Sequence, residues 1–255
     1  VELTSYGQTF LPYARTIART EFEGTSAVKR LQNIENGLLT IASIPSMPQY
    51  QITMFIAQFQ QFYPDTTVRI TEDDSNNLLE YLLNGTCELI FTREDKLAFE
   101  KNFMTNNQII HIPYIKDRMV ALMPTEHPLS CEESVTLQQL KNEHFCFIKE
   151  GSLMHDMCME ACQNAGFIPD IIFTSHRIDS ILDMVTNQDC VALLMDKHME
   201  LPDNGPTQIN VPWKTIPVSP EINSQISLCY RTDKPLSNPA QNFVDFCTSR
   251  LFGLS

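Results

Sequence analysis

Hydroxyl side chains follow an apolar run near the start of the chain. The run covers residues 38–43, Ser43 ends it, and Ser46 stands between Pro45 and Pro48 before a helical pattern resumes. In open α/β sheets, ligands lie beyond the carboxyl ends of strands, where loops lead into helix N-termini. Backbone N–H groups there favour an anion, and a serine hydroxyl can donate to a carboxylate. Ser43 and Ser46 are therefore candidate ligand contacts, although Ser46 could instead be only the N-cap of the next helix.

A second candidate hydroxyl ends the apolar run of residues 87–91. Thr92 follows that run, and we expect it at the same edge of the sheet as Ser43. A plain threonine at a strand end is the alternative interpretation. Arg93, the next residue, could balance an anion, but an arginine is more often exposed.

Two later loops carry polar and charged groups. Lys149, Glu150 and Ser152 stand where a predicted strand gives way to a predicted helix, and His176 stands in a similar loop. Lys149 could pair with an anion and Glu150 with an amine, so the two leave the charge of a ligand open. His176 could bond a ligand or respond to pH, whereas a lone histidine in a loop is more often a surface residue.

One pattern has the residue types of a metal site. His155, Cys158 and Cys162 recur at i, i+3 and i+7 of a predicted helix, so they could share one face. A structural zinc site needs a fourth ligand, and a buried helix face is the favoured interpretation. The chain has no G-x-S-x-G, H-E-x-x-H, P-loop or dinucleotide-binding fingerprint. We expect no metal, no cofactor and no catalytic residue, and therefore no enzyme.

The composition is that of a globular protein with an acidic surface. The chain has 255 residues and a formal net charge of −13, and negative charge repels phosphate groups. The bulk of the chain is therefore not expected to bind nucleic acid by itself. No apolar run reaches the length of about 18 residues that a membrane span needs, and no signal peptide is recognisable. The eight cysteines stand mostly in apolar runs, which favours reduced, buried thiols and a cytoplasmic location.

The elements that position these residues begin with a long helix, predicted over residues 4–33. Its apolar side chains follow a seven-residue spacing, and a helix with so thin a stripe is not stable alone. We expect it to pack on a partner helix, favouring a second copy of itself; folding back on its own domain is the alternative. The stripe consists of Phe10, Ala14, Ile17, Val28 and Leu31.

Strands and helices then alternate along the chain, and such alternation predicts parallel sheets with right-handed crossovers. Two α/β halves of about 100 residues each, with the last strand and helix returning to the first half, would leave a cleft between them. Strands are predicted at residues 38–43, 68–72, 88–91, 109–114, 119–123, 145–148, 171–173, 190–194 and 225–231, and helices at 48–62, around 78–83, and at 137–142, 153–165, 178–186 and 239–251.

Several short motifs together resemble the LysR-type transcriptional regulators. Their order and spacing match that family over nearly the whole chain, although each motif alone is a weak signal. The segments that carry the resemblance are LTSYGQTFLPYAR, GLLTIASIPSM with FIAQFQQFYPDTTVRI, LLEYLLNGTCELIFT, EHPLS and CQNAGFIPDIIFTS.

The resemblance implies a type 2 periplasmic-binding-protein-like fold. Two Rossmann-like subdomains, residues 37–116 plus 218–255 and residues 117–217, would follow a linker and dimerisation helix at 1–36. Two crossing strands, near 112–123 and near 211–218, would form the hinge. The chain would sense a small effector, with a carboxylate as one option, in the cleft between the subdomains. The candidate contacts are Ser43, Ser46, Thr92, Lys149, Glu150, Ser152 and His176, with Ser46 first because it matches a ligand contact in relatives that bind small anions.

The resemblance also implies partners and leaves one alternative open. DNA would be bound only through a winged-helix domain before Val1, and the chain, which lacks a starting Met, would be a piece of a homodimeric or homotetrameric protein without membrane contact. Peroxide-sensing relatives carry a reactive cysteine where Leu153 stands here, so that mode of redox sensing is not expected. Asn187-Gln188-Asp189 stands where the family usually has glycines. The alternative is an extracytoplasmic solute-binding receptor of a transporter, which shares the fold but needs an export signal.

Overall fold

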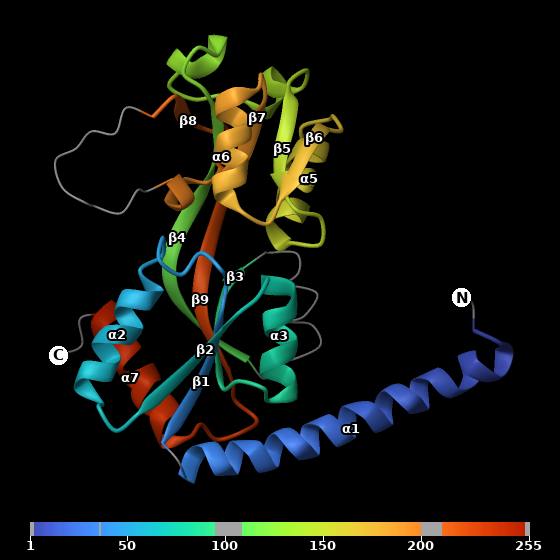
Figure 1. Ribbon diagram of the computed structural model, residues 1–255, viewed down its shortest axis with the longest axis vertical. Helices are drawn as coiled ribbons and strands as arrows, with labels where there is room; N and C mark the ends of the chain where they lie inside the picture. Colours follow the sequence, from blue (N-terminus) through green and yellow to red (C-terminus); the bar gives the residue numbers. More distant parts are fainter. Residues whose placement is uncertain (1–2, 36, 95–108, 200–210, 253–255) are drawn as a thin grey trace.

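The computed structural model describes residues 3–35, 37–94, 109–199 and 211–252. It shows two lobes joined by long strands, with one helix extending from the base of the lower lobe (Figure 1). Lobe I is the lower part, built on β1 (Leu38–Ser43), β2 (Thr67–Glu72), β3 (Leu89–Glu94), β9 (Asn223–Arg231) and the first half of β4 (Ile109–Pro124). Lobe II is the upper part, built on the second half of β4 and on the strands β5–β8 between residues 144 and 217.

Helix α1 spans Ser5–Glu35, close to the predicted 4–33. Its C-terminal end contacts β1 and α3 of lobe I, while the rest of the helix extends away from both lobes (Figure 1). The side chains of Phe10, Ile17 and Val28 are 60%, 62% and 58% exposed. This part of the stripe is therefore not covered by any element among the described residues.

Lobe I has the β-α-β-α-β order that the sequence predicts. Strand β1 is the centre of a parallel trio with β2 and β3, and β9 returns antiparallel between β3 and β4. Helix α3 is held by Asp74 at its N-cap and by Gly85, at φ +79°, as its C-cap. The elements are β1 (Leu38–Ser43), α2 (Ile52–Phe62), β2 (Thr67–Glu72), α3 (Ser75–Asn84), β3 (Leu89–Glu94), β9 (Asn223–Arg231) and α7 (Asn238–Phe252).

Lobe II repeats the pattern on a second sheet. Strand β5 pairs in parallel with β6 and β7, and the end of β4 pairs antiparallel with β7 and β8. The elements are β5 (His144–Ile148), α5 (Leu153–Asn164), β6 (Asp170–Ser175), α6 (Ile178–Asn187), β7 (Val191–Met195), β8 (Trp213–Pro217) and the 3-10 helices η1 (Pro128–Cys131), η2 (Leu137–Leu140) and η3 (Asp196–Met199).

The lobes are joined by β4 and by the connection between β8 and β9. Strand β4, Ile109–Pro124, is one continuous strand of 16 residues where the sequence predicted two separate ones. Its first half pairs with β9 and its second half with β7 and β8. The polar residues Lys116–Arg118 interrupt the apolar pattern, because that stretch crosses between two cores, and this interruption suggested a break. The second crossing strand was predicted near 211–218, but β8, Trp213–Pro217, pairs with the end of β4 within lobe II, so that placement is wrong. The chain returns to lobe I through residues 218–222 and then β9.

Two predicted helices differ from the observed ones. The helix expected from residue 48 begins at Ile52, because residues 46–51 form turns and Gln51 takes a left-handed backbone at φ +57°. The helix expected at 137–142 is the single 3-10 turn Leu137–Leu140, capped by Thr136.

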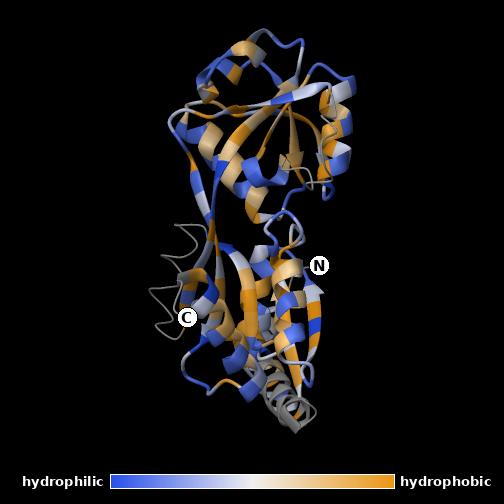
Figure 2. Ribbon diagram, turned by 90° about the vertical axis from the view of Figure 1, so that its left-hand side faces the viewer, coloured by the Kyte–Doolittle hydropathy of each residue, from blue (hydrophilic) through white to orange (hydrophobic). Residues whose placement is uncertain are grey.

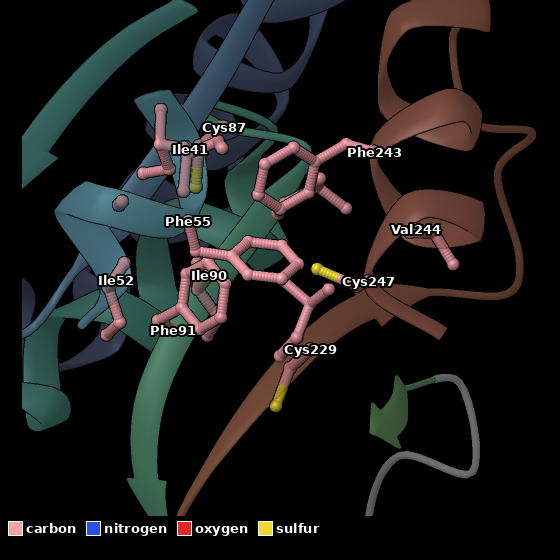
Figure 3. Packing of buried hydrophobic residues seen from close by; sticks show 14 of the residues in the cluster. Ile41, Ile52, Phe55, Cys87, Ile90, Phe91, Cys229, Phe243, Val244 and Cys247 are labelled. Atoms are coloured by element: carbon pink, nitrogen blue, oxygen red, sulfur yellow. The ribbon is translucent and has the colours of Figure 1, made fainter. Parts of the chain in front are cut away.

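Aromatic rings fill the core of lobe I. Phe243 of α7 has its ring centre 5.9 Å from that of Phe55 and 4.9 Å from that of Phe59, and Phe91 of β3 lies on the same cluster (Figure 3). Each fully buried ring contributes roughly 2–3 kcal/mol to stability by leaving water. Figure 2 shows the same division in both lobes, with hydrophobic residues on the strands and hydrophilic residues on outer helix faces and loops.

Seven of the eight cysteines are buried free thiols, as their apolar surroundings predicted. Cys131 is the exposed exception, because it ends the short surface helix η1. Among the described residues, no helix combines the length and apolarity that crossing a membrane requires.

Candidate functional site

A cleft of about 510 Å³ lies between the two lobes. Lobe I contributes the loop after β1, the start of α3 and the end of β3, while lobe II contributes the loops after β5 and β6. The carboxyl ends of the parallel strands thus face one another across the cleft, as the rule for open α/β sheets requires. Four predicted residues line it together: Ser46, Glu150, Ser152 and His176.

Ser46 is a cleft side chain and not a helix cap. Because α2 begins at Ile52 with Gln51 at its N-cap, the alternative role predicted for Ser46 is wrong. The Ser46 Oγ lies 3.2 Å from Nε2 of His198, which follows β7 in η3. The Ser46–His198 contact therefore joins the loop after β1 in lobe I to η3, which follows β7 of lobe II.

Arg93 forms the charged floor of the cleft. Its side chain is only 5% exposed, so the expectation of an exposed arginine is wrong. Its Nη1 donates to Ser224 Oγ at 2.9 Å, its Nη2 donates to the Tyr50 hydroxyl, and its guanidinium carbon lies 5.3 Å from the Tyr50 ring centre. The charge is therefore held in place by a serine and a phenol.

Tyr50 passes a hydrogen bond on to Asp117. Its hydroxyl donates to Asp117 Oδ2 at 2.5 Å, and Asp117 Oδ1 accepts from the backbone N–H groups of Arg118 and Lys197. Burial is the main cause that raises the pKa of Tyr50, so the phenol stays protonated as the donor. This chain of bonds reaches from the cleft floor to the crossing strand β4.

His198 is a neutral imidazole inside this cluster. It is 8% exposed, and its ring packs edge-on against Tyr50 at 5.9 Å between centres. Burial, with a smaller effect from the charge of Arg93, lowers the pKa of His198 to about 3. Its Nδ1 is buried and has no hydrogen-bond partner in the part of the chain that the structure describes.

The two lobes touch across one edge of the cleft. Ser152 caps α5 by accepting from His155 N at 3.1 Å, after Gly151 at φ +89° turns the chain. Asp74 Oδ1, the cap of α3, also accepts from Leu153 N at 3.2 Å, and Asn76 Nδ2 donates to Gly151 O at 3.1 Å. One carboxylate of lobe I thus lies at the positive N-termini of helices from both lobes.

The structure places three predicted residues away from the cleft lining. Ser43 is fully buried at the end of β1, and the Lys149 side chain is exposed at the end of β5. Thr92 is half-buried on β3, where side chains alternate between faces. Since Arg93 lines the cleft, Thr92 points to the opposite face, and Arg93 takes the place in the lining that was expected for Thr92.

Sequence reasoning missed Tyr50, Asp117 and His198 entirely. A usable signal existed for Arg93, which stands two residues after the apolar Phe91 and so shares its buried face. No comparable signal marked the other three, because segments far apart in the sequence bring them together.

The histidine and cysteines at helical spacing lie within the packing of lobe II. His155 Nδ1 is 3.0 Å from Ile148 O, the Cys158 thiol is directed to Leu193 O at 3.5 Å, and Cys162 is buried. No group of three potential metal ligands is found among the residues that the structure describes.

A second cavity of about 830 Å³ lies against α5, η2 and residues 218–223. Its charged lining residues, Glu94 and Glu160, are both acidic, and no residue predicted for the site lines it. We therefore assign the candidate site to the smaller cleft, where buried polar groups of both lobes converge.

Comparison with known proteins decides the family. The sequence profile of the LysR substrate binding domain matches residues 32–251. The chain belongs to the LysR substrate-binding domain family. A relative is the uncharacterized HTH-type transcriptional regulator YybE of Bacillus subtilis (strain 168), 24% identical over 249 residues, covering 98% of this chain and 80% of YybE.

Solved structures show the same fold for this LysR domain. The CcmR regulatory domain of Synechocystis PCC6803 in complex with 2-PG superposes with a TM-score of 0.71 at 15% identity, covering 84% of this chain and 96% of that one. The effector-binding domain of QuiR in complex with shikimate gives 0.67 at 14% identity, covering 82% and 94%. The predicted family and the predicted fold of two α/β subdomains with a crossing-strand hinge are confirmed.

The function predicted for this LysR domain, the sensing of an effector in a transcriptional regulator, is that of its family. The match gives no support to the transporter receptor. The boundaries predicted for the two subdomains and the individual contact residues stay predictions.

Proposed function

We propose that this LysR domain binds a small metabolite in the cleft between its lobes and thereby controls transcription. The observation that carries the proposal is the cleft itself, where Ser46 and Arg93 of lobe I face Glu150, Ser152 and His176 of lobe II. A ligand held by both lobes favours one arrangement of them, because it shifts the equilibrium by its difference in affinity for the two arrangements. Such couplings are typically about 1–3 kcal/mol.

The ligand class that fits the cleft includes small carboxylates. Two proteins of the same fold have structures with a bound ligand, CcmR with 2-PG and QuiR with shikimate. In the cleft of this chain, the Arg93 guanidinium supplies a positive charge at the floor. Catalysis is not part of the proposal, since the named relatives are regulators and the sequence carries no recognised catalytic motif.

Oligomerisation through α1 completes the proposal. The exposed stripe of Phe10, Ile17 and Val28 suits a helix from a second copy, and its seven-residue spacing is that of a coiled coil. The orientation of a DNA-binding domain linked to α1 would then depend on the arrangement of the lobes. Such a regulator would act in the cytoplasm, where bacterial DNA is transcribed. Light scattering should give at least twice the chain mass of 29.2 kDa, and a mass of one chain would contradict this part.

A thermal-shift screen tests the ligand site. Small carboxylates, amino acids and aromatic acids are screened against the wild-type chain, and hits are measured by calorimetry. Ser46→Trp fills the cleft and should abolish binding, whereas Ser134→Trp, at an exposed serine outside the cleft lining, should leave it unchanged. A ligand that binds Ser46→Trp as tightly as the wild type would place the site elsewhere.

A further inference from the structure

The floor of the cleft holds a buried cation without a carboxylate partner. Arg93 is 5% exposed, and it forms no ion pair with any carboxylate in the described ranges of the chain. Asp117, which accepts from Tyr50, is separated from the guanidinium by that phenol. Asp117 compensates the charge only through this shared phenol. A buried charge is most stable with a direct partner, and the open side of Arg93 is the cleft.

Arg93 also retains hydrogen-bonding capacity. Of the five N–H groups of a guanidinium, one on Nη1 bonds Ser224 and one on Nη2 bonds Tyr50. The remaining three have no protein partner among the residues that the structure covers. An oxyanion, carboxylate or phosphate, is the group that accepts from such a fork with two parallel bonds.

A second unpartnered group lies beside this cation. His198 lines the cleft, is 92% buried by its 8% exposure, and has its Nδ1 unbonded within the described part of the protein. Its Nε2 is satisfied by Ser46 at 3.2 Å. A neutral imidazole with its other nitrogen engaged offers the ligand either one N–H or one lone pair, and a hydroxyl matches both.

The charge of Arg93 selects between hydroxyl and ammonium. Arg93 is close enough to disfavour a proton on His198, so a positive group on the ligand at the same place would be repelled as well. The acidic residues of the lining are Asp73, Asp74, Glu150 and Asp179. Asp73 accepts from Tyr81 and Asn77, Asp74 accepts from the backbone of Asn76 and Leu153, Asp179 pairs with Arg177, and Glu150 is exposed at the rim. An uncharged donor is therefore favoured over an amine.

We propose that the effector is a small hydroxy acid, whose oxyanion is bound by Arg93 and whose neighbouring hydroxyl bonds Nδ1 of His198. This inference rests on the proposed function, because it names the ligand class of the same cleft. Arg93 supplies affinity for any oxyanion, whereas His198 makes the site distinguish a hydroxylated acid from its analogue without the hydroxyl.

Matched trios of acids test the proposal by calorimetry on the whole chain. Butanoate, 2-hydroxybutanoate and 2-aminobutanoate form one trio, and phenylacetate, mandelate and phenylglycine the other; glycerol 3-phosphate with propyl phosphate distinguishes phosphate from carboxylate as the anion. In at least one trio the hydroxy acid should bind at least about tenfold more tightly than both other members.

Three variants separate the roles of the two residues. Arg93→Gln should abolish binding of every acid, and Arg93→Lys, which keeps the charge but not the fork, should weaken it at least about tenfold. His198→Phe keeps a ring against Tyr50 but has no polar atom, so it should make the hydroxy acid and its unsubstituted analogue bind equally. Circular dichroism melts confirm that each variant is folded; if Arg93→Gln unfolds, His198→Phe still tests the hydroxyl.

The outcomes separate this inference from the proposed function. Equal affinity across each trio, no binding of any acid, or an unchanged preference in His198→Phe overturns the hydroxy-acid proposal. If a ligand of another class then binds and Ser46→Trp abolishes its binding, the proposed function stands. If no ligand is found whose binding Ser46→Trp abolishes, both fail.

Discussion

Replacing Asp74 by alanine removes one carboxylate that serves both lobes. Its Oδ1 accepts from Asn76 N at 3.1 Å, which caps α3, and from Leu153 N at 3.2 Å at the start of α5. Loss of an N-cap costs about 1 kcal/mol, and loss of a partly exposed hydrogen bond about 1 kcal/mol more. We expect Asp74→Ala to lower the free energy of unfolding by about 2 kcal/mol, half of it from the contact between lobes.

Asp74→Asn separates these two contributions. Asparagine caps helices as well as aspartate and keeps an acceptor oxygen, but it loses the charge that strengthens the bond to the Leu153 amide. We expect a loss below about 1 kcal/mol. Asn76→Ala, which removes the exposed side-chain bond to Gly151 O, is the control for the other contact across the same edge, with an expected loss of about 0.5 kcal/mol.

Urea unfolding measures the stability, and hydrogen exchange reports the contact directly. If the bond between lobes is worth about 1 kcal/mol, the Leu153 amide in Asp74→Ala should exchange about fivefold faster. An effector that needs the closed cleft should bind more weakly by a similar factor. Unchanged exchange at Leu153, or equal losses of stability in Asp74→Ala and Asp74→Asn, would refute the role of this carboxylate as a bridge.

Three further outcomes follow from burial. The pKa of His198 is about 6.5 in the unfolded chain and about 3 in the folded one. The contribution of the neutral imidazole to folding stability is therefore complete above about pH 6.5 and is lost as the pH falls toward 3. Urea unfolding should show a loss of about 1 kcal/mol in the free energy of unfolding from pH 7 to 5.5, and His198→Phe should not show it. Phe243→Ala, at a fully buried ring, should cost about 3–5 kcal/mol in urea unfolding, whereas a similar loss in Phe62→Ala, 61% exposed, would contradict the assigned core. Mass spectrometry should find Cys131 alkylated first in the native protein, and a faster buried thiol would contradict the packing.

Periodicity predicted most elements because most have one buried face. Helix α1 and strand β1 were found within two residues of their bounds. The β1 run is uninterrupted, and the α1 stripe keeps its seven-residue spacing although Glu21 and Gly24 are not apolar. The crossing strand β4 was split because Lys116–Arg118 is polar although the backbone stays extended. The start of α2 was misplaced because the turn at Gln51 carries no glycine or capping serine to mark it.

The site was harder to predict than the fold because its groups meet only in three dimensions. The loops after the parallel strands were recognisable, and they supplied Ser46, Glu150, Ser152 and His176. The choice between Thr92 and Arg93 depended on which face of β3 meets the cleft, and a shift of one residue along a strand exchanges the faces. An arginine is rarely buried, so its residue type argued against Arg93, which the structure places buried in the cleft lining.

The buried cluster gives a physical route from ligand to hinge. Arg93 and Tyr50 belong to lobe I, whereas Asp117 lies on the crossing strand β4 and accepts from the backbone of Lys197, in η3 after β7 of lobe II. An anion on Arg93 would draw on the same guanidinium that donates to Tyr50, and Tyr50 holds Asp117. Because Asp117 bonds segments of both lobes, a change in that chain of bonds acts on the strand that joins them. A ligand bound only at the rim, by Glu150 or His176, would lack this connection.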